Sequence, residues 1–372
     1  MRFGGRRVPG YGGIVGWPED PDILLTGPRG RRLCWELVAE MGRPAQARVG
    51  PAWGQARADS LDAGPAELAG ELMAAAGQRD WPVALAGMGE AVLLGALADS
   101  VAWAMYWQAP DGVDRALAYP EMTEPLRPVA RAVTGAPAVN WWSSGIEPGT
   151  QQYVEAAAGR HGTGPALSGA ADQIAAWQAA EADDERAAAG RPDDPAASYS
   201  GHWWSAPAGS RLVSTTRALP GVGALQLTAK EDWPGWEKVK CWPVTPRRAP
   251  RTYEIAGPGD WVALVGRYPL DVSRSRRHDW WRVTGWAGTW LMPDYAAVSA
   301  DYDAIHLSVG GYLTTAGNAL PVGEARCLLA GWDPDETYWL ADILTPAGPP
   351  VRWTWEGWPN LRWRPAPPDN PA

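Results

Sequence analysis

The chain of 372 residues has one phenylalanine, three cysteines and four histidines. The cysteines, Cys34, Cys241 and Cys327, are too far apart in sequence to form the closely spaced ligand pairs of a structural zinc site. No two histidines are separated by the four positions that place both side chains on one face of a helix. These absences exclude zinc-finger and helical zinc-protease motifs, and we expect no metal cofactor.

Long hydrophobic runs are also missing. The most apolar stretch, residues 81–107, is interrupted by Glu90 and Asp99, so no charge-free run approaches the ~20 residues that cross a bilayer. The first 16 residues lack the apolar segment of a secretory signal. We therefore expect no membrane partner and a cytoplasmic location.

Acidic residues outnumber basic ones, 42 to 33, which gives a formal net charge of −9. A protein that follows an extended phosphate backbone needs a large positive surface, so extended nucleic acid is not an expected partner. The length exceeds that of most single hydrophobic cores and favours two domains. The hydrophobic content of 46% excludes wholesale disorder.

The first third of the chain has helical periodicity. Apolar residues recur at helical spacing across residues 20–135, which predicts an α-helical domain. The expected helices cover residues 31–41, 65–76, 83–107 and 117–133. Residues 136–200 form a connecting segment, with an Ala- and acid-rich helix over 170–189 and a linker.

The pattern changes after residue 200. Residues 201–365 contain short runs that favour β-strands between Gly, Pro and Asp turns, and two helical insertions at 260–267 and 294–299. The expected strands lie at 211–217, 224–229, 237–242, 252–255, 281–284, 305–309, 326–329 and 337–340. We predict an α+β protein whose second, Trp-rich domain contains a mostly antiparallel sheet.

The chain has 25 tryptophans. The composition is that of a GC-rich genome, which by itself enriches tryptophan and arginine. Indole rings also provide good stacking and cation–π surfaces, which is the functional alternative. Trp353 and Trp355 would share one face of a strand, either buried at a sheet edge or exposed as a carbohydrate-binding strip.

One basic island interrupts the acidic chain at residues 273–282. Arginine forms bidentate hydrogen bonds with phosphate, and indole stacks on bases, so this island is a candidate phosphate or nucleotide site. The alternative is a solvated loop whose arginines pair with acidic residues earlier in the chain. The candidate substrate-binding residues are Arg274, Arg276, Arg277, His278 and Trp281.

A second candidate group lies on two later strands. On a strand over residues 304–309, His306 and Ser308 point to the same face. Glu336 would project from the start of the strand at 337–340, where a carboxylate can act as a general base or stabilise a positively charged sugar carbon. The alternative is a structural turn at 333–336 in which the Asp side chains accept backbone N–H groups.

The order of Arg251, Ser308 and Glu336 resembles that of small ADP-ribosyltransferase domains, over residues 251–340. The resemblance implies that NAD is a substrate, with Arg251 on a phosphate, Ser308 supporting the nicotinamide-binding strand and Glu336 directing the nucleophile. The family's Ser-Thr-Ser triplet is absent, and its Glu-x-Glu pair is present only as Asp-Pro-Asp-Glu at 333–336. The whole chain also resembles intracellular proteins of actinobacteria, a likeness that implies no particular function.

Three functions remain open from the sequence. The first is binding of NAD or a related nucleotide with ADP-ribosyl transfer or NAD hydrolysis, in which Arg251, Ser308 and Glu336 are catalytic and His306 assists binding. The second is a non-catalytic module with a Trp-lined surface for a protein partner. The third is carbohydrate binding through Trp353 and Trp355.

Overall fold

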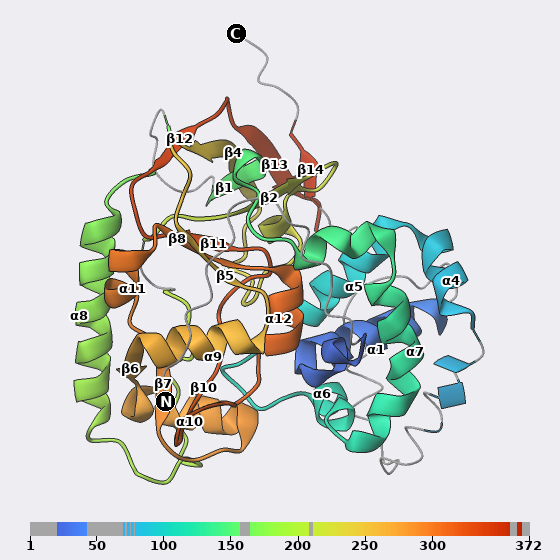
Figure 1. Cartoon of the computed structure of the whole chain (residues 1–372), viewed down its shortest axis with the longest axis horizontal. Coiled ribbons are helices and arrows are strands. Elements are labelled where there is room, and N and C mark those ends of the chain that lie inside the picture. The colour runs from blue at the N-terminus through green and yellow to red at the C-terminus, as the bar shows by residue number, and fades with distance from the viewer. Residues whose placement is uncertain are drawn as a thin grey trace, which may run out of the picture.

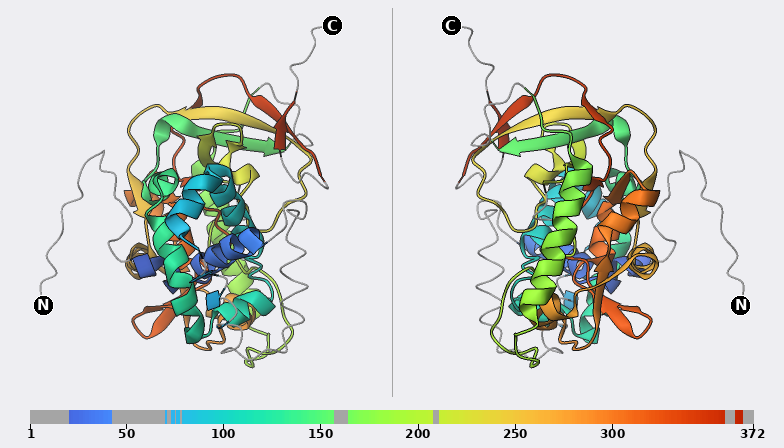
Figure 2. Two further views of the ribbon diagram at one scale, coloured as in Figure 1. Left: turned by 90° about the vertical axis from the view of Figure 1, so that its right-hand side faces the viewer. Right: turned by 90° about the vertical axis from the view of Figure 1, so that its left-hand side faces the viewer.

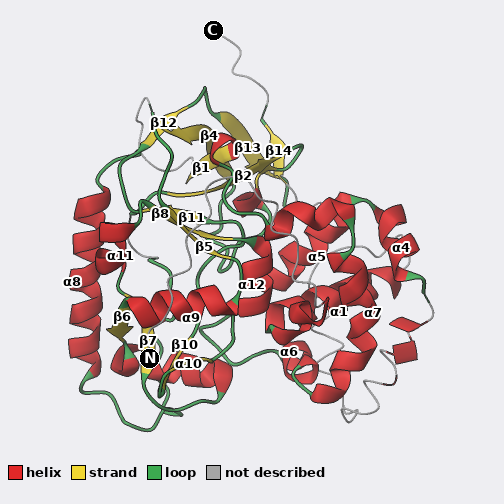
Figure 3. Cartoon of the chain, viewed as in Figure 1, coloured by secondary structure: helices red, strands yellow, loops and turns green. Residues whose placement is uncertain are grey.

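The computed structural model describes residues 21–42, 70, 73–74, 76–77, 79–156, 164–207, 211–357 and 363–366. One group of helices lies on the right of Figure 1, apart from the strands, whereas the strands lie at the top, in the middle and at the lower left, with further helices beside them (Figure 3). The predicted α+β class is confirmed.

The helices on the right of Figure 1 come from the N-terminal third. They are η1 (Pro21–Thr26), α1 (Pro28–Gly42), α4 (Trp81–Met88), α5 (Glu90–Ala102), α6 (Gly112–Leu117), η2 (Pro120–Met122) and α7 (Thr123–Thr134). The single helix expected over 83–107 is wrong, because Gly89 adopts a φ of +76° and ends α4 before α5 begins. Most of the helix expected over 65–76 lies outside the described residues.

The larger sheet has the strand order β14-β13-β4-β1-β2-β11-β8-β5, with β12 and β3 paired at its side. Its strands are β1 (Gln151–Ala156), β2 (Ser214–Leu219), β3 (Gly223–Ala224), β4 (Lys238–Pro246), β5 (Thr252–Ile255), β8 (Ala304–Leu307), β11 (Thr337–Trp339), β12 (Leu344–Pro346), β13 (Val351–Trp355) and β14 (Trp363–Pro365). Only the β5–β8 pair is parallel, so the expected mostly antiparallel sheet is confirmed.

A smaller sheet, five α-helices and three short 3-10 helices, η3 (Pro137–Ser143), η4 (Pro148–Thr150) and η5 (Leu225–Leu227), complete the described part. The sheet has the order β6-β7-β10-β9. Its strands are β6 (Pro269–Asp271), β7 (Trp290–Pro293), β9 (Leu320–Val322) and β10 (Ala325–Cys327), and the helices are α8 (Ala170–Ala188), α9 (Pro258–Arg267), α10 (Ser273–Thr284), α11 (Tyr295–Asp301) and α12 (Val309–Thr315). The strand expected at 281–284 is wrong, because these residues continue α10, whose buried positions recur at helical spacing.

Helix α8 runs along the side of the molecule opposite the N-terminal helices, and it faces the viewer in the right panel of Figure 2. Its bounds confirm the helix expected over 170–189, and it packs against α10 and α11. The connecting segment is therefore part of the folded structure and holds α10 in place.

One contiguous core joins the regions expected as separate domains, residues 20–135 and 201–365. Helix α12 contacts both α1 and η1. The approach is close at Gly27, where a Cβ atom would lie 2.2 Å from the carbonyl oxygen of Leu313, so only glycine fits there. This contact fixes the N-terminal helices against the second half of the chain.

Most tryptophans with little exposure belong to this core. Six of them are among the largest side chains that are less than 2% exposed: Trp81, Trp142, Trp261, Trp280, Trp290 and Trp332. Trp339 is equally buried but belongs to a separate, smaller cluster. Indole rings here supply the core volume that phenylalanine supplies in other proteins.

Among the described residues, none of the helices has both the length and the apolar composition needed to cross a bilayer. The pair α4 and α5 has that composition only when taken together, and it is bent by 103°.

Candidate functional site

The three residues expected to be catalytic lie near opposite ends of β8. Arg251 forms an ion pair with Asp303 just before the strand, with 3.0 Å between Nη2 and Oδ1. Ser308, just after the strand, caps α12. The backbone N–H of Leu307, the residue before Ser308, donates a hydrogen bond to the carbonyl oxygen of Glu336. At about 3.3 Å per residue, the five positions from Asp303 to Ser308 span about 16 Å. The structure brings Ser308 and Glu336 together, and it does not bring Arg251 to them.

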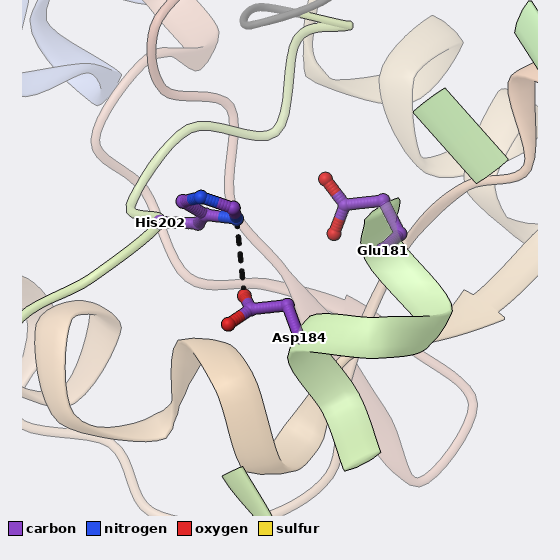
Figure 4. Close-up of side chains that lie close together, drawn as sticks. All are labelled: Glu181, Asp184 and His202. Atoms are coloured by element: carbon purple, nitrogen blue, oxygen red, sulfur yellow. Dashed lines mark ion pairs between the residues drawn. The ribbon is translucent and has the colours of Figure 1, made fainter. Parts of the chain in front are cut away.

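Arg276 of the basic island is fully buried between two carboxylates. Its Nη2 atom lies 2.7 Å from Oε2 of Glu181, and its Nη1 atom lies 3.0 Å from Oδ2 of Asp184. Figure 4 shows these two carboxylates beside His202, whose Nδ1 atom is 3.1 Å from Asp184. One ligand atom from each of the three residues lies within 4.8 Å of the others, as in a metal site. The guanidinium group of Arg276 already occupies both carboxylates through hydrogen bonds, so we propose no metal here.

The rest of the island is also held by earlier parts of the chain. Arg277 pairs with Asp193 at 2.8 Å, and Nδ1 of the buried His278 lies 3.2 Å from the carbonyl oxygen of Pro195. Trp281 is half-buried, and Arg274 is exposed. Arg276 and Arg277 therefore pair with acidic residues earlier in the chain, as the alternative interpretation of the island expected. They lie on helix α10, however, and not in a loop.

His306 belongs to a row of charges that crosses β5, β8 and the turn before β11. Its Nδ1 atom lies 2.6 Å from Oε2 of Glu254, and its Nε2 atom lies 3.4 Å from Oδ1 of Asp335. Asp335 also accepts from the backbone N–H and the guanidinium of Arg217. Burial opposes the imidazolium charge, but the two carboxylates outweigh it and raise the pKa of His306 to about 9.

Glu336 belongs to a second buried group. Asp333, three residues before Glu336, forms an ion pair with Lys230 at 2.7 Å. Its carboxylate also accepts a hydrogen bond from the backbone N–H of Glu231 at 2.8 Å. Burial and the nearby Asp333 raise the pKa of Glu336 to about 7. Asp335, between them, has a φ of +61°, a strained value for a residue with a side chain. Backbone hydrogen bonds and ion pairs therefore both stabilise residues 333–336. This is the arrangement that the alternative of a structural turn describes.

A cleft of about 270 Å³ lies elsewhere, between the N-terminal helices and the second half of the chain. One wall comes from the first turn of α1, from α6 and from the turn after α5, and the other comes from the end of α10 and the segment between α12 and β10. The lining includes the polar residues Arg29, Arg31, Tyr106, Gln108, Asp111, Asp114, Thr284, Asn318 and Arg326. Its volume is at the lower end of the usual range for small-molecule sites.

Two cations in this lining have no carboxylate of the described residues in hydrogen-bond contact. Arg31 donates through Nη1 to the carbonyl oxygens of Leu25 and Thr26, at 2.8 and 3.3 Å. Arg326 donates to the carbonyl oxygen of Ala319 at 3.3 Å, and its guanidinium lies 5.2 Å from the ring centroid of Trp286. Carbonyl oxygens and an aromatic face hold both groups in place, and neither guanidinium group is engaged in an ion pair among the described residues.

Three buried donor atoms in the lining lack a hydrogen-bond partner among the described residues: Nε of Arg29, Nε of Arg31 and the hydroxyl of Tyr106. Arg29 is 1% exposed and Tyr106 is 5% exposed. A buried donor without a partner costs about 1–3 kcal/mol, so such groups call for an explanation. A bound ligand with acceptor atoms would supply the missing partners.

The cleft was missed in the sequence because its residues come from distant segments. Arg31 lies at the start of a segment that was predicted only as a helix, 31–41, and Arg326 lies in a run that was predicted only as a strand, 326–329. The one available signal was a pair of arginines at 29 and 31 in the first turn of a helix, where cations are unfavourable unless something else compensates them.

The chain was compared with family models, with curated proteins and with solved structures, and nothing matches it. Its function must therefore be argued from the geometry of these side chains alone.

Proposed function

We propose that this protein binds a small acidic molecule in the cleft between α1 and the segment that joins α12 to β10. The single observation that carries the proposal is the presence of two cleft arginines, Arg31 and Arg326, that have no carboxylate in hydrogen-bond contact. A guanidinium group in a concave, partly enclosed site favours a negatively charged partner, because little water remains to solvate it.

The N-terminal end of α1 also favours a negatively charged ligand. The helix has 15 residues, and its first turn, with Pro28, Arg29 and Arg31, lines the cleft. The N-terminus of a helix carries partial positive charge and unpaired N–H groups, which favours anions. The unpartnered Nε of Arg29 is a further donor in the same wall.

The hypothesis that NAD is a substrate remains a prediction. Glu336, Ser308 and Arg251 are not among the residues that line the cleft, and neither is any member of the basic island at 273–282. Binding in the cleft and an ADP-ribosyl transfer or NAD hydrolysis at Glu336 are therefore separate hypotheses. The binding experiment below includes NAD for this reason.

The carbohydrate alternative has weaker support. Trp353 is 6% exposed, and its ring packs where Gly223 has no side chain, so Trp353 and Trp355 do not form a strip of two exposed indoles. Trp355 packs against Trp233 and Trp363 in tilted arrangements, not as a flat platform.

Titration calorimetry with benzoate, inorganic phosphate, citrate and NAD tests the proposal. We expect saturable binding of at least one of these anions, weakened about tenfold or more in Arg31→Gln and in Arg326→Gln, because each loses a hydrogen bond to a charged group. Arg274→Gln is the matched control, since Arg274 is exposed on α10 and outside the cleft. Equal affinity in all three variants, or no binding of any anion, would refute the proposal.

A further inference from the structure

The charges around the cleft define how much negative charge a ligand can bring. Several charged residues line the cleft or continue from it through ion pairs. The positive members are Arg29, Arg31, Arg32 and Arg326, and the negative members are Glu36, Asp111 and Asp114. The set carries one positive charge more than negative charges.

The negative members are all engaged by two arginines. Asp114 pairs with Arg29 and, at 3.2 Å, with Arg32. Arg32 also pairs with Asp111 at 2.9 Å and with Glu36 at 2.7 Å. Two guanidinium groups thus face three carboxylates, and this buried group is negative by one charge.

Arg31 and Arg326 differ in how far their charge is compensated. Burial and the neighbouring Arg29 lower the pKa of Arg31, while Asp114 raises it, which places Arg31 in the field of the same carboxylates. Arg31 thereby offsets the one excess negative charge of the group around Arg32. The positive charge of Arg326, on β10, is then the one charge of the set that no acidic member compensates.

The remainder of the lining is largely apolar. It includes Trp103, Met105, Ala109, Pro110, Ala118, Val283 and Ala319. A ligand that fits this wall has an apolar body, and the Tyr106 hydroxyl, which has no partner among the described residues, is available to its acceptor atoms.

From this arrangement we infer that the ligand of the cleft is a small organic monocarboxylate with an apolar body, bound through Arg326 and Arg31. The inference rests on the proposed function and adds the charge and the chemical class. One negative charge neutralises the site, whereas a phosphate monoester with two charges would leave a net negative charge in a partly enclosed space, which is unfavourable.

Three probes with the same ring separate the possibilities: benzoate with one negative charge, phenyl phosphate with two, and neutral benzamide. Phosphate monoesters lose their second proton near pH 6, so titrations at pH 8 compare the fully charged forms. We expect benzoate to bind at least tenfold more tightly than either of the other two. We also expect Arg326→Gln to abolish this preference and Arg274→Gln to retain it.

Each outcome has a distinct meaning. If phenyl phosphate binds more tightly than benzoate and depends on Arg31 and Arg326, the cleft is an anion site and the monocarboxylate inference is wrong. If benzamide binds as well as benzoate, the charge inference is wrong in the other direction. If no probe binds, or binding is the same in Arg326→Gln, the inference fails, and the proposed function fails with it when inorganic phosphate, citrate and NAD do not bind either.

Discussion

The Nδ1 atom of His306 lies 2.6 Å from Oε2 of Glu254, so an imidazole without solvent exposure contacts a carboxylate that is 38% exposed. The other ring nitrogen lies 3.4 Å from Asp335, which is buried and paired with Arg217. An imidazole between two carboxylates is stabilised as the imidazolium ion. The contact therefore links the stability of the large sheet to pH.

The first prediction concerns this linkage. The pKa of His306 in the folded protein, about 9, is above the value near 6.5 of an unfolded chain. Its stabilisation is fully present below about pH 6.5 and is lost as the pH rises through 9. The free energy of unfolding should fall by an amount of the order of 3 kcal/mol across this window. Urea unfolding at several pH values measures the decline.

A substitution at Glu254 identifies the source of this effect. Glu254→Gln keeps the side-chain size and removes one of the two charges, so we expect a shallower decline and a lower pKa of His306 by NMR titration. Glu147→Gln is the control, because Glu147 is 62% exposed and pairs only distantly, at 3.8 Å, with Arg217. A decline that is unchanged in Glu254→Gln would show that Glu254 does not hold the proton on His306.

The second prediction concerns Glu336, whose pKa in the folded protein is raised to about 7 by burial and by Asp333. The folded state holds this proton more tightly than the unfolded chain, so stability falls as the pH rises from about 4.5 to 7. Glu336→Gln should flatten the dependence in that window, while Glu237→Gln, at an exposed position, should not. Urea unfolding between pH 4.5 and 8 distinguishes the two variants. An equally steep dependence in Glu336→Gln would contradict the assignment.

Periodicity predicted the elements whose burial follows a simple repeat. The helices over 170–189 and 260–267 and the strand at 252–255 were found within a few residues of the observed α8, α9 and β5. The segment at 281–284 was predicted as a strand because it is short and rich in β-favouring residues. It is the end of α10, whose burial against α8 depends on ion pairs with residues almost 100 positions away.

The candidate site was harder to predict for the same reason. Glu336 was predicted as catalytic and His306 as substrate-binding, and both roles stay predictions. The structure places each of them in a charged cluster whose other members, Glu254, Arg217 and Lys230, come from three other segments. Arg251 was assigned to the same group from its order in the chain. The register of β5 against β8 places it beside Asp303 instead, and order along a chain does not determine that register.

The third prediction concerns the buried Arg276. Arg276→Met removes the guanidinium and leaves the carboxylates of Glu181 and Asp184 close together with little solvent. Removing one partner of a buried ion pair costs about 3–5 kcal/mol, and we expect a loss of this order in urea unfolding at pH 7. The double variant Arg276→Met with Glu181→Met should recover part of it, because one of the unpaired charges is gone. A loss below about 1 kcal/mol in Arg276→Met would show that water reaches the pair.

The last prediction compares two glycines that both have positive φ. Gly331, with φ +73°, approaches Trp204 so closely that a Cβ atom would lie 2.4 Å from the Cβ of that residue. Gly323, with φ +60°, lies in the turn between β9 and β10 and has no atom within 4 Å of such a Cβ. Gly323→Ala should therefore cost only the backbone strain of about 1–2 kcal/mol.

Gly331→Ala should cost a further 1–3 kcal/mol or so, because the new methyl group meets an atom attached directly to the backbone and cannot be relieved by a side-chain rotation. The segment it would push is fixed next to it, since the backbone N–H of Ser205 donates to the carbonyl oxygen of Ala330 at 2.8 Å. Urea unfolding of both variants measures the difference. Equal losses would mean that residues 203–205 shift without cost, and that this segment is less firmly bound to the core than its hydrogen bonds indicate.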